Sequence, residues 1–277
     1  MQGFSAEKPL LLMGCGRMGH AMAMGWLRAG LAPEHLYVVD PSAPPSCLPN
    51  MAEGHFVTNP NALPHGLKAR VIIVAVKPQV IGGILPLLTP FADEGTLVIS
   101  VAAGVPLSML EDGIAVDATY VRAMPNTPAA IGAGITGLTA GADISVADKA
   151  LARELLHAVG ETVWIEDESM MNAVTALSGS GPAYVFHLVE CMAHAGAELG
   201  LAPEIAMQLA RQTVIGSARL MDEETDVSVS GLRRQVTSPG GTTEAALKIL
   251  RHPDTGLADL MVRALGAAES RGKELGG

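Results

Sequence analysis

The stretch P-L-L-L-M-G-C-G-R-M-G, residues 9–19, decides the fold of this chain. Its apolar run ends in a glycine turn, which is the pattern of a buried parallel strand. Residues 18–29 are good helix formers, and Gly30 ends them. Residues 35–40 then contain L-Y-V-V, which predicts a second strand. The N-terminus is therefore predicted to form one strand–helix–strand unit.

The three glycines of this stretch follow the spacing G-x-G-x-x-G, from Gly14 through Gly16 to Gly19. The first glycine lets the chain turn, the second lets the backbone approach a pyrophosphate, and the third lets the helix pack on the strand. The free N–H groups at the start of the helix would then face the phosphates. We predict a dinucleotide site rather than a plain glycine turn, because strand, helix and second strand all fall where such a site needs them.

Asp40 ends the second predicted strand, about twenty residues beyond Gly19. A carboxylate at this place accepts hydrogen bonds from the adenosine ribose hydroxyls and repels a 2′-phosphate. No Lys or Arg lies between Ala29 and Leu67 to neutralise such a phosphate. We therefore expect NADH to be used at least as well as NADPH; the alternative is that Asp40 only caps a loop.

Strand-like and helix-like stretches alternate along the chain up to about residue 166. The alternation indicates an α/β fold with an open, mostly parallel, doubly wound sheet of Rossmann type. Residues 41–64 are rich in Pro, Asn and Ser and are predicted to be a loop with at most a short helix. The further predicted strands are 71–76, 96–101, 120–124, 135–139 and 162–165, and the predicted helices are 81–88 and 146–159.

The character of the sequence changes after Glu166, where long Ala-rich helical stretches follow and no strand-like run occurs. We place a domain boundary near Asp167, between a dinucleotide-binding domain at 1–167 and an all-helical domain at 168–277. The small residues of 178–184, S-G-S-G-P-A-Y, are expected to allow close packing at the domain junction. They do not form the G-x-S-x-G turn of hydrolases, because no strand precedes them.

Two further stretches follow predicted strands at the edge where open α/β sheets bind ligands. Residues 75–78 read A-V-K-P, and Lys77 there is either a phosphate or ribose contact or a solvated surface charge. Asn126, within R-A-M-P-N-T-P at 122–128, can both donate and accept hydrogen bonds. That property suits the amide of nicotinamide.

The run Q-V-T-S-P-G-G-T-T, residues 235–243, precedes a predicted helix at 244–250. Its proline and glycines produce a tight turn in which backbone N–H groups and hydroxyls converge on a helix N-terminus. Such a place can bind a small anion, for example a substrate carboxylate. An ordinary helix cap, with Thr242 or Thr243 bonded to the first turn, explains the run equally well.

The composition excludes several classes of function. The chain has 277 residues and a net charge of −10, which disfavours nucleic acids and anionic membranes as partners. Aromatic residues make up 3%, too few for a base-stacking platform. Three cysteines without a Cys-x-x-Cys pair fit free thiols in a reducing compartment. With no recognisable targeting signal or membrane span, we expect a soluble, cytoplasmic enzyme.

No metal site is predicted from the sequence. His187, Glu190, Cys191 and His194 share helical spacing, as metal ligands can. The stretch also has the composition of a packed Ala/Val/Leu helix, which is the preferred interpretation. The acidic clusters at 166–168 and 222–224 are interpreted as solvated loops or caps.

Five motifs together resemble the pyrroline-5-carboxylate reductase family over essentially the whole chain. The resemblance implies NAD(P)H-dependent reduction of (S)-1-pyrroline-5-carboxylate to L-proline, the last step of proline synthesis. It also implies a homodimer formed through the helical domain, which in the family often assembles into a decamer. The motifs are G-C-G-R-M-G-H-A at 14–21, V-K-P-Q at 76–79, M-P-N-T-P at 124–128, S-G-S-G-P-A-Y at 178–184 and the signature L-R-R-Q-V-T-S-P-G-G-T-T-E-A-A-L at 232–247.

The resemblance also implies roles for individual residues. Thr243 would hydrogen-bond near the ring nitrogen and is the one catalytic candidate, while Gln235 and the region of Asn61 would lie near the cofactor. The predicted substrate contacts are Ser238, Gly240, Gly241, Thr242 and Thr243. The predicted cofactor contacts are Gly14, Cys15, Gly16, Arg17, Met18, Gly19, Asp40, Asn61, Ala75, Val76, Lys77, Pro78, Asn126 and Gln235.

The expected chemistry asks little of side chains, because a protonated cyclic imine is already a good hydride acceptor and most of the rate comes from proximity and orientation. Two alternatives remain open. The first is a different small-carboxylate reductase of the same architecture, such as a β-hydroxyacid dehydrogenase. A β-hydroxyacid dehydrogenase needs a catalytic lysine on the helical domain, and no lysine lies between Ser178 and Lys248. A sensor that holds NAD(H) without turnover would not need the turn at 238–243.

Overall fold

The computed structural model describes residues 1, 3–42, 45–48 and 50–275. The chain divides into two compact units, which are described separately. The first, the sheet unit, comprises Met1–Gly179 together with the C-terminal residues from Ala268 on, and the second, the helical unit, comprises Ser180–Ala267. The compact units part after Gly179, because the helical residues 168–179 and the end of the last helix pack with the sheet, whereas the domain boundary predicted from the sequence lies near Asp167.

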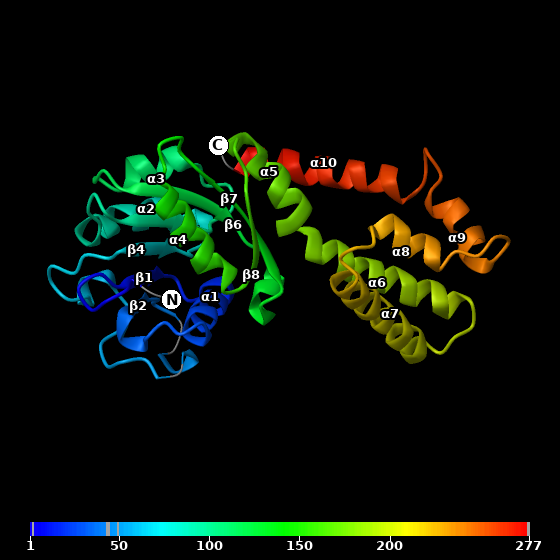
Figure 1. Cartoon of the computed structure of the whole chain (residues 1–277), viewed down its shortest axis with the longest axis horizontal. Coiled ribbons are helices and arrows are strands. Elements are labelled where there is room, and N and C mark those ends of the chain that lie inside the picture. Colours follow the sequence, from blue (N-terminus) through cyan, green and yellow to red (C-terminus); the bar gives the residue numbers. More distant parts are fainter. Residues whose placement is uncertain (2, 43–44, 49, 276–277) are drawn as a thin grey trace. The chain divides into compact units, whose positions relative to one another are not determined.

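Eight strands of the described residues form one sheet in the order β3-β2-β1-β4-β5-β6-β7-β8 (Figure 1). All neighbouring strands are parallel except β6 and β7. The first six strands have the order of the doubly wound dinucleotide-binding fold, so the predicted sheet is confirmed. The strands are β1 (Leu10–Met13), β2 (Leu36–Val39), β3 (Phe56–Val57), β4 (Val71–Val74), β5 (Leu97–Ser100), β6 (Thr119–Met124), β7 (Gly134–Ala140) and β8 (Gly160–Trp164).

Both faces of the sheet are covered, which explains why the central strands are apolar throughout. In β1, Leu10 and Leu12 belong to the core under α1 and α4, whereas Leu11 and Met13 belong to the core under α2 and α3. All four side chains are buried. The short helix α3 was not predicted from the sequence. The helices on the two faces are α1 (Arg17–Arg28), α2 (Pro78–Leu88), α3 (Leu107–Gly113) and α4 (Val146–His157).

The segment 41–64 contains a strand that the sequence did not predict. Phe56–Val57 pairs in parallel with β2, although we expected this segment to be loop. A strand of two residues is too short to show a periodic pattern. Residues 43, 44 and 49 of the same prediction lie outside the described residues.

The remainder of the described chain is helical, as predicted. A short helix and a π-helical turn at Thr175–Gly179 lead into the first long helix of the second unit. There α6 and α7 pack closely, since a Cβ built on Gly196 would lie 3.2 Å from the Cβ of Ala206. None of the described helices is long and apolar enough to cross a membrane. The helices are α5 (Met171–Val174), α6 (Gly181–Glu198), α7 (Pro203–Glu223), α8 (Val229–Gln235), α9 (Thr242–Leu250) and α10 (Leu257–Leu275).

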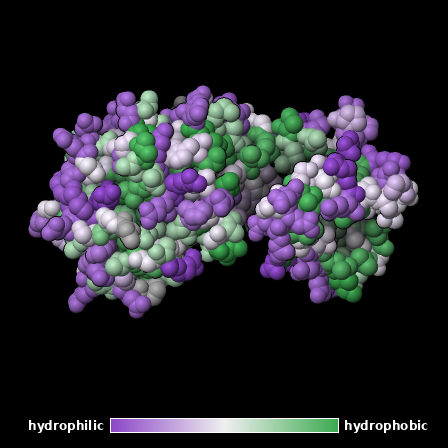
Figure 2. Space-filling view, viewed as in Figure 1, coloured by the Kyte–Doolittle hydropathy of each residue, from purple (hydrophilic) through white to green (hydrophobic). Residues whose placement is uncertain are grey.

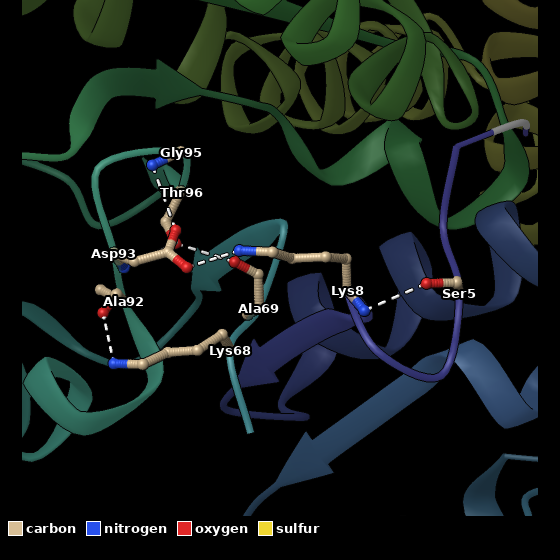
Figure 3. Close-up of polar contacts among 8 residues, drawn as sticks. All are labelled: Ser5, Lys8, Lys68, Ala69, Ala92, Asp93, Gly95 and Thr96. Atoms are coloured by element: carbon tan, nitrogen blue, oxygen red, sulfur yellow. Dashed lines mark hydrogen bonds and ion pairs between the residues drawn. The ribbon is translucent and has the colours of Figure 1, made fainter. Parts of the chain in front are cut away.

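At the amino edge of the sheet, polar side chains connect the segments that precede neighbouring strands (Figure 3). Lys8, just before β1, forms an ion pair with Asp93, just before β5. Thr96 donates a hydrogen bond to the carbonyl oxygen of Ala69 at 2.8 Å, which ties the start of β5 to the start of β4. The glycine turn after β1 lies at the opposite, carboxyl edge, which is where open α/β sheets bind their ligands.

Candidate functional site

The glycine loop between β1 and α1 needs its first and third glycines for steric reasons. Gly14 has a φ of +94°, and a Cβ there would lie 2.6 Å from the carbonyl oxygen of Ala75. A Cβ on Gly19 would lie 2.0 Å from the carbonyl oxygen of Gly14. Both close approaches involve backbone atoms, so neither position accepts a side chain without moving the loop.

Gly16 differs, because a Cβ built on it meets no atom within 4 Å. Its side-chain position points into open space, which is the space a pyrophosphate would fill. Gly16 is also the N-cap of α1, and no side chain of the described residues caps this end. The N–H groups of the first turn are thus available to an anion, so the loop fits the phosphates of a dinucleotide. Arg17, the first residue of α1 and the neighbour of Gly16, is exposed.

Asp40 lies directly after β2 and is buried. Its Oδ2 accepts a hydrogen bond from the backbone N–H of Cys15 at 2.6 Å, and its Oδ1 accepts one from the N–H of Ser42 at 2.7 Å. The carboxylate therefore anchors the backbone of the glycine loop to the segment that follows β2, at the carboxyl edge of the sheet. Both carboxylate oxygens of Asp40 thus take part in the hydrogen bonding of this edge of the sheet.

Further predicted cofactor contacts of the sheet unit lie in the turns that follow the neighbouring strands. Ala75 and Val76 follow β4 and lie against Gly14, and Lys77 is the exposed N-cap of α2 with Pro78 in its first turn. Asn61 follows β3 in a short 3-10 turn, where its backbone N–H is bound by the side chain of Asn59 at 2.9 Å.

Asn126 has a structural role that the sequence did not reveal. Its Oδ1 accepts a hydrogen bond from the N–H of Ile135 at 3.0 Å, and its Nδ2 donates one to Oγ of Ser178 at 3.3 Å. The amide thereby connects the end of β6 to the start of β7 and to the π-helical turn. The predicted nicotinamide contact therefore has to use the second amide hydrogen or the second lone pair of Oδ1.

A cavity of about 260 Å³ opens in the sheet unit beside the predicted contact Pro78. Ala103 and Gly104 reach it from the turn after β5, and Asn172 reaches it from α5. None of these three was predicted, although the run A-A-G after a predicted strand is the same kind of signal as A-V-K-P. The lining residues are Pro78, Gln79, Ala103, Gly104, Asn172, Thr175 and Gly272.

Glu168, one of the acidic residues at 166–168, forms hydrogen bonds within the protein, although the cluster was interpreted as a solvated loop or cap. Glu168 accepts a hydrogen bond from the buried guanidinium of Arg122 at 3.0 Å and another from the N–H of Leu107 at 2.9 Å. Asp167, by contrast, caps the following turn through Ser169, as predicted. Arg122 and Glu168 thus connect β6, the start of α3 and the turn at Glu168–Met170 within the sheet unit.

Cys15, the second residue of the glycine loop, carries a thiol that stays protonated at neutral pH. Burial, together with the nearby Cys47 and Asp40, raises the pKa of Cys15 to about 12. Its Sγ lies 3.8 Å from Sγ of Cys47. The backbone N–H of Cys15 is bound by Asp40, so a hydrogen bond of the main chain holds this part of the loop in place.

In the helical unit, the turn at 238–243 leads into α9 with Gly241 as the N-cap. Gly240 has a φ of +73°, and a Cβ on Gly241 would lie 2.4 Å from Oγ of Ser238. Neither Thr242 nor Thr243 provides the side-chain cap that was the alternative interpretation, because both lie inside the first turn. Within the described part of the chain, their N–H groups have no partner, as expected for the start of a helix.

One carboxylate limits this anion site. Glu244 accepts a hydrogen bond from the N–H of Gly240 at 2.8 Å, so this amide is occupied. The N–H of Gly241 is bound to the carbonyl oxygen of Ser238 at 3.1 Å. The donors that remain are the amides of Thr242 and Thr243 and the nearby hydroxyls. Gln235, the last residue of α8, belongs to this unit as well, whereas all other predicted cofactor contacts belong to the sheet unit.

Comparison with known proteins agrees with both units. Residues 168–275 match the family profile described as pyrroline-5-carboxylate reductase dimerisation, and residues 10–104 match the profile described as NADP oxidoreductase, coenzyme F420-dependent. The pyrroline-5-carboxylate reductase of Pseudomonas aeruginosa is 44% identical over 75% of this chain and 75% of its own length.

Two solved structures extend this likeness to the full length. A pyrroline-5-carboxylate reductase from Coxiella burnetii is 36% identical, with a TM-score of 0.85 over 98% of this chain and 99% of its own. A pyrroline carboxylate reductase from Plasmodium falciparum, solved with NADP bound, is 29% identical, with a TM-score of 0.81 over 99% of this chain and 100% of its own.

Proposed function

The chain belongs to the pyrroline-5-carboxylate reductase family, and on that premise we propose that it reduces (S)-1-pyrroline-5-carboxylate to L-proline in proline biosynthesis. The enzyme is an NAD(P)-dependent oxidoreductase. The single observation that carries the proposal is the full-length likeness to solved reductases of this name, which includes both units.

The glycine loop is the proposed site of NAD(P)H. Support comes from the open side-chain position at Gly16 and from the uncapped N-terminus of α1, which together suit a pyrophosphate. For the choice of cofactor, we propose that NADH is used at least as well as NADPH. The buried carboxylate of Asp40 supports this, because it would repel a 2′-phosphate.

The start of α9 is the proposed site of the substrate carboxylate. The amides of Thr242 and Thr243 and the hydroxyl of Ser238 offer hydrogen-bond donors at a helix N-terminus, with Gly240 and Gly241 shaping the turn. The N–H of Gly240 is already bound by Glu244 and is not available to the substrate. The few donors that remain suit a small anion.

The proposed reaction transfers a hydride to the imine carbon, while the imine nitrogen ends with one proton. Bound NAD(P)H supplies the hydride. The residues of the chain fix the carboxylate and the orientation of the ring, which is where most of the rate comes from. Because the protonated imine already carries the required proton, no strong general acid is assigned. Thr243 is proposed to donate or accept a hydrogen bond near the ring nitrogen.

We further propose that the helical unit pairs with that of a second copy of the chain. Its large apolar side chains are exposed in the single chain, and hydrophobic groups gather on parts of its visible surface (Figure 2). The match of residues 168–275 to the dimerisation profile supports this pairing. Assembly of such dimers into a decamer is a further proposal from the family resemblance. A cytoplasmic location is proposed from the three free cysteines.

The test is the oxidation of NADH and of NADPH by the purified protein in the presence of pyrroline-5-carboxylate. We expect turnover and the formation of L-proline. A sensor would bind NADH without turnover, and a β-hydroxyacid dehydrogenase would reduce NAD⁺ with a β-hydroxyacid instead. Either of these results would replace the proposal.

A further inference from the structure

Three potential metal ligands meet beside the glycine loop, although they are far apart in the sequence. Cys15 lies in the loop itself, His20 lies in the first turns of α1, and Cys47 ends the 3-10 turn at Pro45–Cys47. The two sulfur atoms and a ring nitrogen of His20 all lie within 4.8 Å of one another. The proposed reaction uses none of these side chains.

The distance between the sulfur atoms distinguishes two uses of the pair. Sγ of Cys15 and Sγ of Cys47 are 3.8 Å apart. Two thiolates bound to one tetrahedral zinc ion at about 2.3 Å each also lie about 3.8 Å apart. A disulfide would require the sulfur atoms to approach to about 2.05 Å. The spacing of the two sulfur atoms therefore matches that of two ligands of one zinc ion, whereas a disulfide would need them to move closer.

We propose that Cys15, His20 and Cys47 form a binding site for a thiophilic divalent cation, Zn²⁺ in the first place, with water as the fourth ligand. Two sulfur ligands and one imidazole select such an ion over Mg²⁺ or Ca²⁺, which prefer oxygen. Three protein ligands and one open position is a known arrangement for zinc.

The surroundings suit such an ion electrostatically. Cys15 is buried in the apolar core under α1, and Cys47 is half-buried against the same core. On binding, the ion would displace the protons of both thiols, which pass to solvent. Two thiolates and one divalent cation form a complex without net charge, which an apolar environment tolerates. His20 and Cys47 are only partly buried, so an ion can enter from solvent.

The ion would also connect two parts of the dinucleotide site. Cys15 lies between Gly14 and Gly16, and its N–H is bound by Asp40. Cys47 belongs to the segment that follows Asp40. Bound zinc would hold this segment against the glycine loop through its side-chain ligands.

The experiment uses the full-length protein, freed of metal and fully reduced with a phosphine, with three free thiols verified by thiol titration. Co²⁺ is added as the probe, because it gives a thiolate charge-transfer band and the visible bands of a tetrahedral site. We expect one Co²⁺ per chain with both signatures, and we expect Zn²⁺ to displace it.

The variants Cys15→Ser and Cys47→Ser should each lose the charge-transfer intensity of the paired thiolates, and His20→Asn should weaken binding roughly tenfold or more. Cys191→Ser is the matched control, since Cys191 lies on α6 next to His187 with a sulfur–nitrogen distance of 3.5 Å. It should keep the wild-type spectrum and stoichiometry.

Circular dichroism and thermal melting of the metal-free variants check their folding. Should Cys15→Ser fail to fold, Cys47→Ser still decides the matter, because Cys47 lies in a surface turn. The proposal is overturned if the reduced wild type shows no Co²⁺–thiolate band, if the band keeps its wild-type intensity in Cys47→Ser, or if it disappears in Cys191→Ser. These results do not depend on whether the protein reduces pyrroline-5-carboxylate.

Discussion

The sheet unit and the helical unit bury their apolar side chains to very different extents. In the sheet unit, both faces of the strands are covered and two separate cores are closed. In the helical unit, the buried hydrophobic residues among those described are Ala193, Ala206, Ala210 and Leu232. Large side chains such as Leu209, 54% exposed, remain on the surface. The sheet unit is therefore complete in one chain, whereas the helical unit needs a second apolar surface.

The largest expected effect concerns this second surface. Leu209→Asp on α7 should dissociate the proposed dimer, raising its dissociation constant about 1,000-fold, because an unpaired charge would be buried at the interface. Leu87→Asp makes the same change on α2 of the sheet unit, where Leu87 is 43% exposed. It should leave the oligomer intact. Analytical ultracentrifugation of both variants makes the measurement, and equal behaviour of the two would contradict the contrast between the units.

The second prediction contrasts two glycines of one loop. Gly19→Ala should lower the free energy of unfolding by about 3 kcal/mol or more, because its Cβ would meet the carbonyl oxygen of Gly14. Gly16→Ala should change stability by no more than about 0.5 kcal/mol, since its Cβ meets nothing. The same Cβ should nevertheless weaken NADH binding roughly tenfold. Urea denaturation and a fluorescence titration with NADH separate the two effects.

The third prediction concerns the helical unit alone. Thr243→Ala should lower kcat/KM for pyrroline-5-carboxylate by roughly 10- to 100-fold, the usual cost of one lost hydrogen bond in a reacting complex. The dissociation constant of NADH should stay unchanged. Thr243→Ser keeps the hydroxyl and should recover most of the activity. An equal loss of NADH affinity in Thr243→Ala would count against the role of this residue at the substrate.

The fourth prediction concerns Asp40. The wild type should show a kcat/KM with NADH at least equal to that with NADPH. Asp40→Asn should shift the ratio of the two values toward NADPH by roughly three- to tenfold, because the charge that opposes a 2′-phosphate is removed. Steady-state kinetics with both cofactors provides the measurement. A strong NADPH preference of the wild type would show that the carboxylate does not set the choice.

The smallest effect is expected at the amino edge of the sheet. The hydrogen bond from Lys8 holds the pKa of Asp93 below its ordinary value of 3.8. A depressed folded-state pKa stabilises the fold above the unfolded pKa, and this contribution is lost as the pH falls through the folded pKa. Lys8→Ala should therefore cost about 0.5 kcal/mol at neutral pH, since the pair is partly exposed, and less at about pH 3. Urea midpoints at the two pH values test this, and a cost independent of pH would contradict it.

The sequence predicts the regions whose structure depends on local pattern. The strand, glycine turn and helix at 10–28 were found because periodicity and glycine spacing are local signals. The strand Phe56–Val57 was missed, because two residues carry no period. Three features depend on tertiary packing: the approach of Cys47 to Cys15, the hydrogen bond between Asn126 and Ile135, and the packing of the residues from Ala268 on with the sheet unit. No local pattern encodes these contacts.

The most direct test of the proposed reaction follows the hydride itself. The enzyme is supplied with pyrroline-5-carboxylate and with NADH, or in a parallel reaction NADPH, carrying deuterium on the transferred position of the nicotinamide, and the product is analysed by mass spectrometry. Hydride transfer to the imine carbon predicts L-proline that contains one deuterium per molecule at the former imine carbon. Oxidation of the cofactor without labelled proline, or no oxidation of either deuterated NADH or deuterated NADPH, would contradict the assignment of this chain as a pyrroline-5-carboxylate reductase.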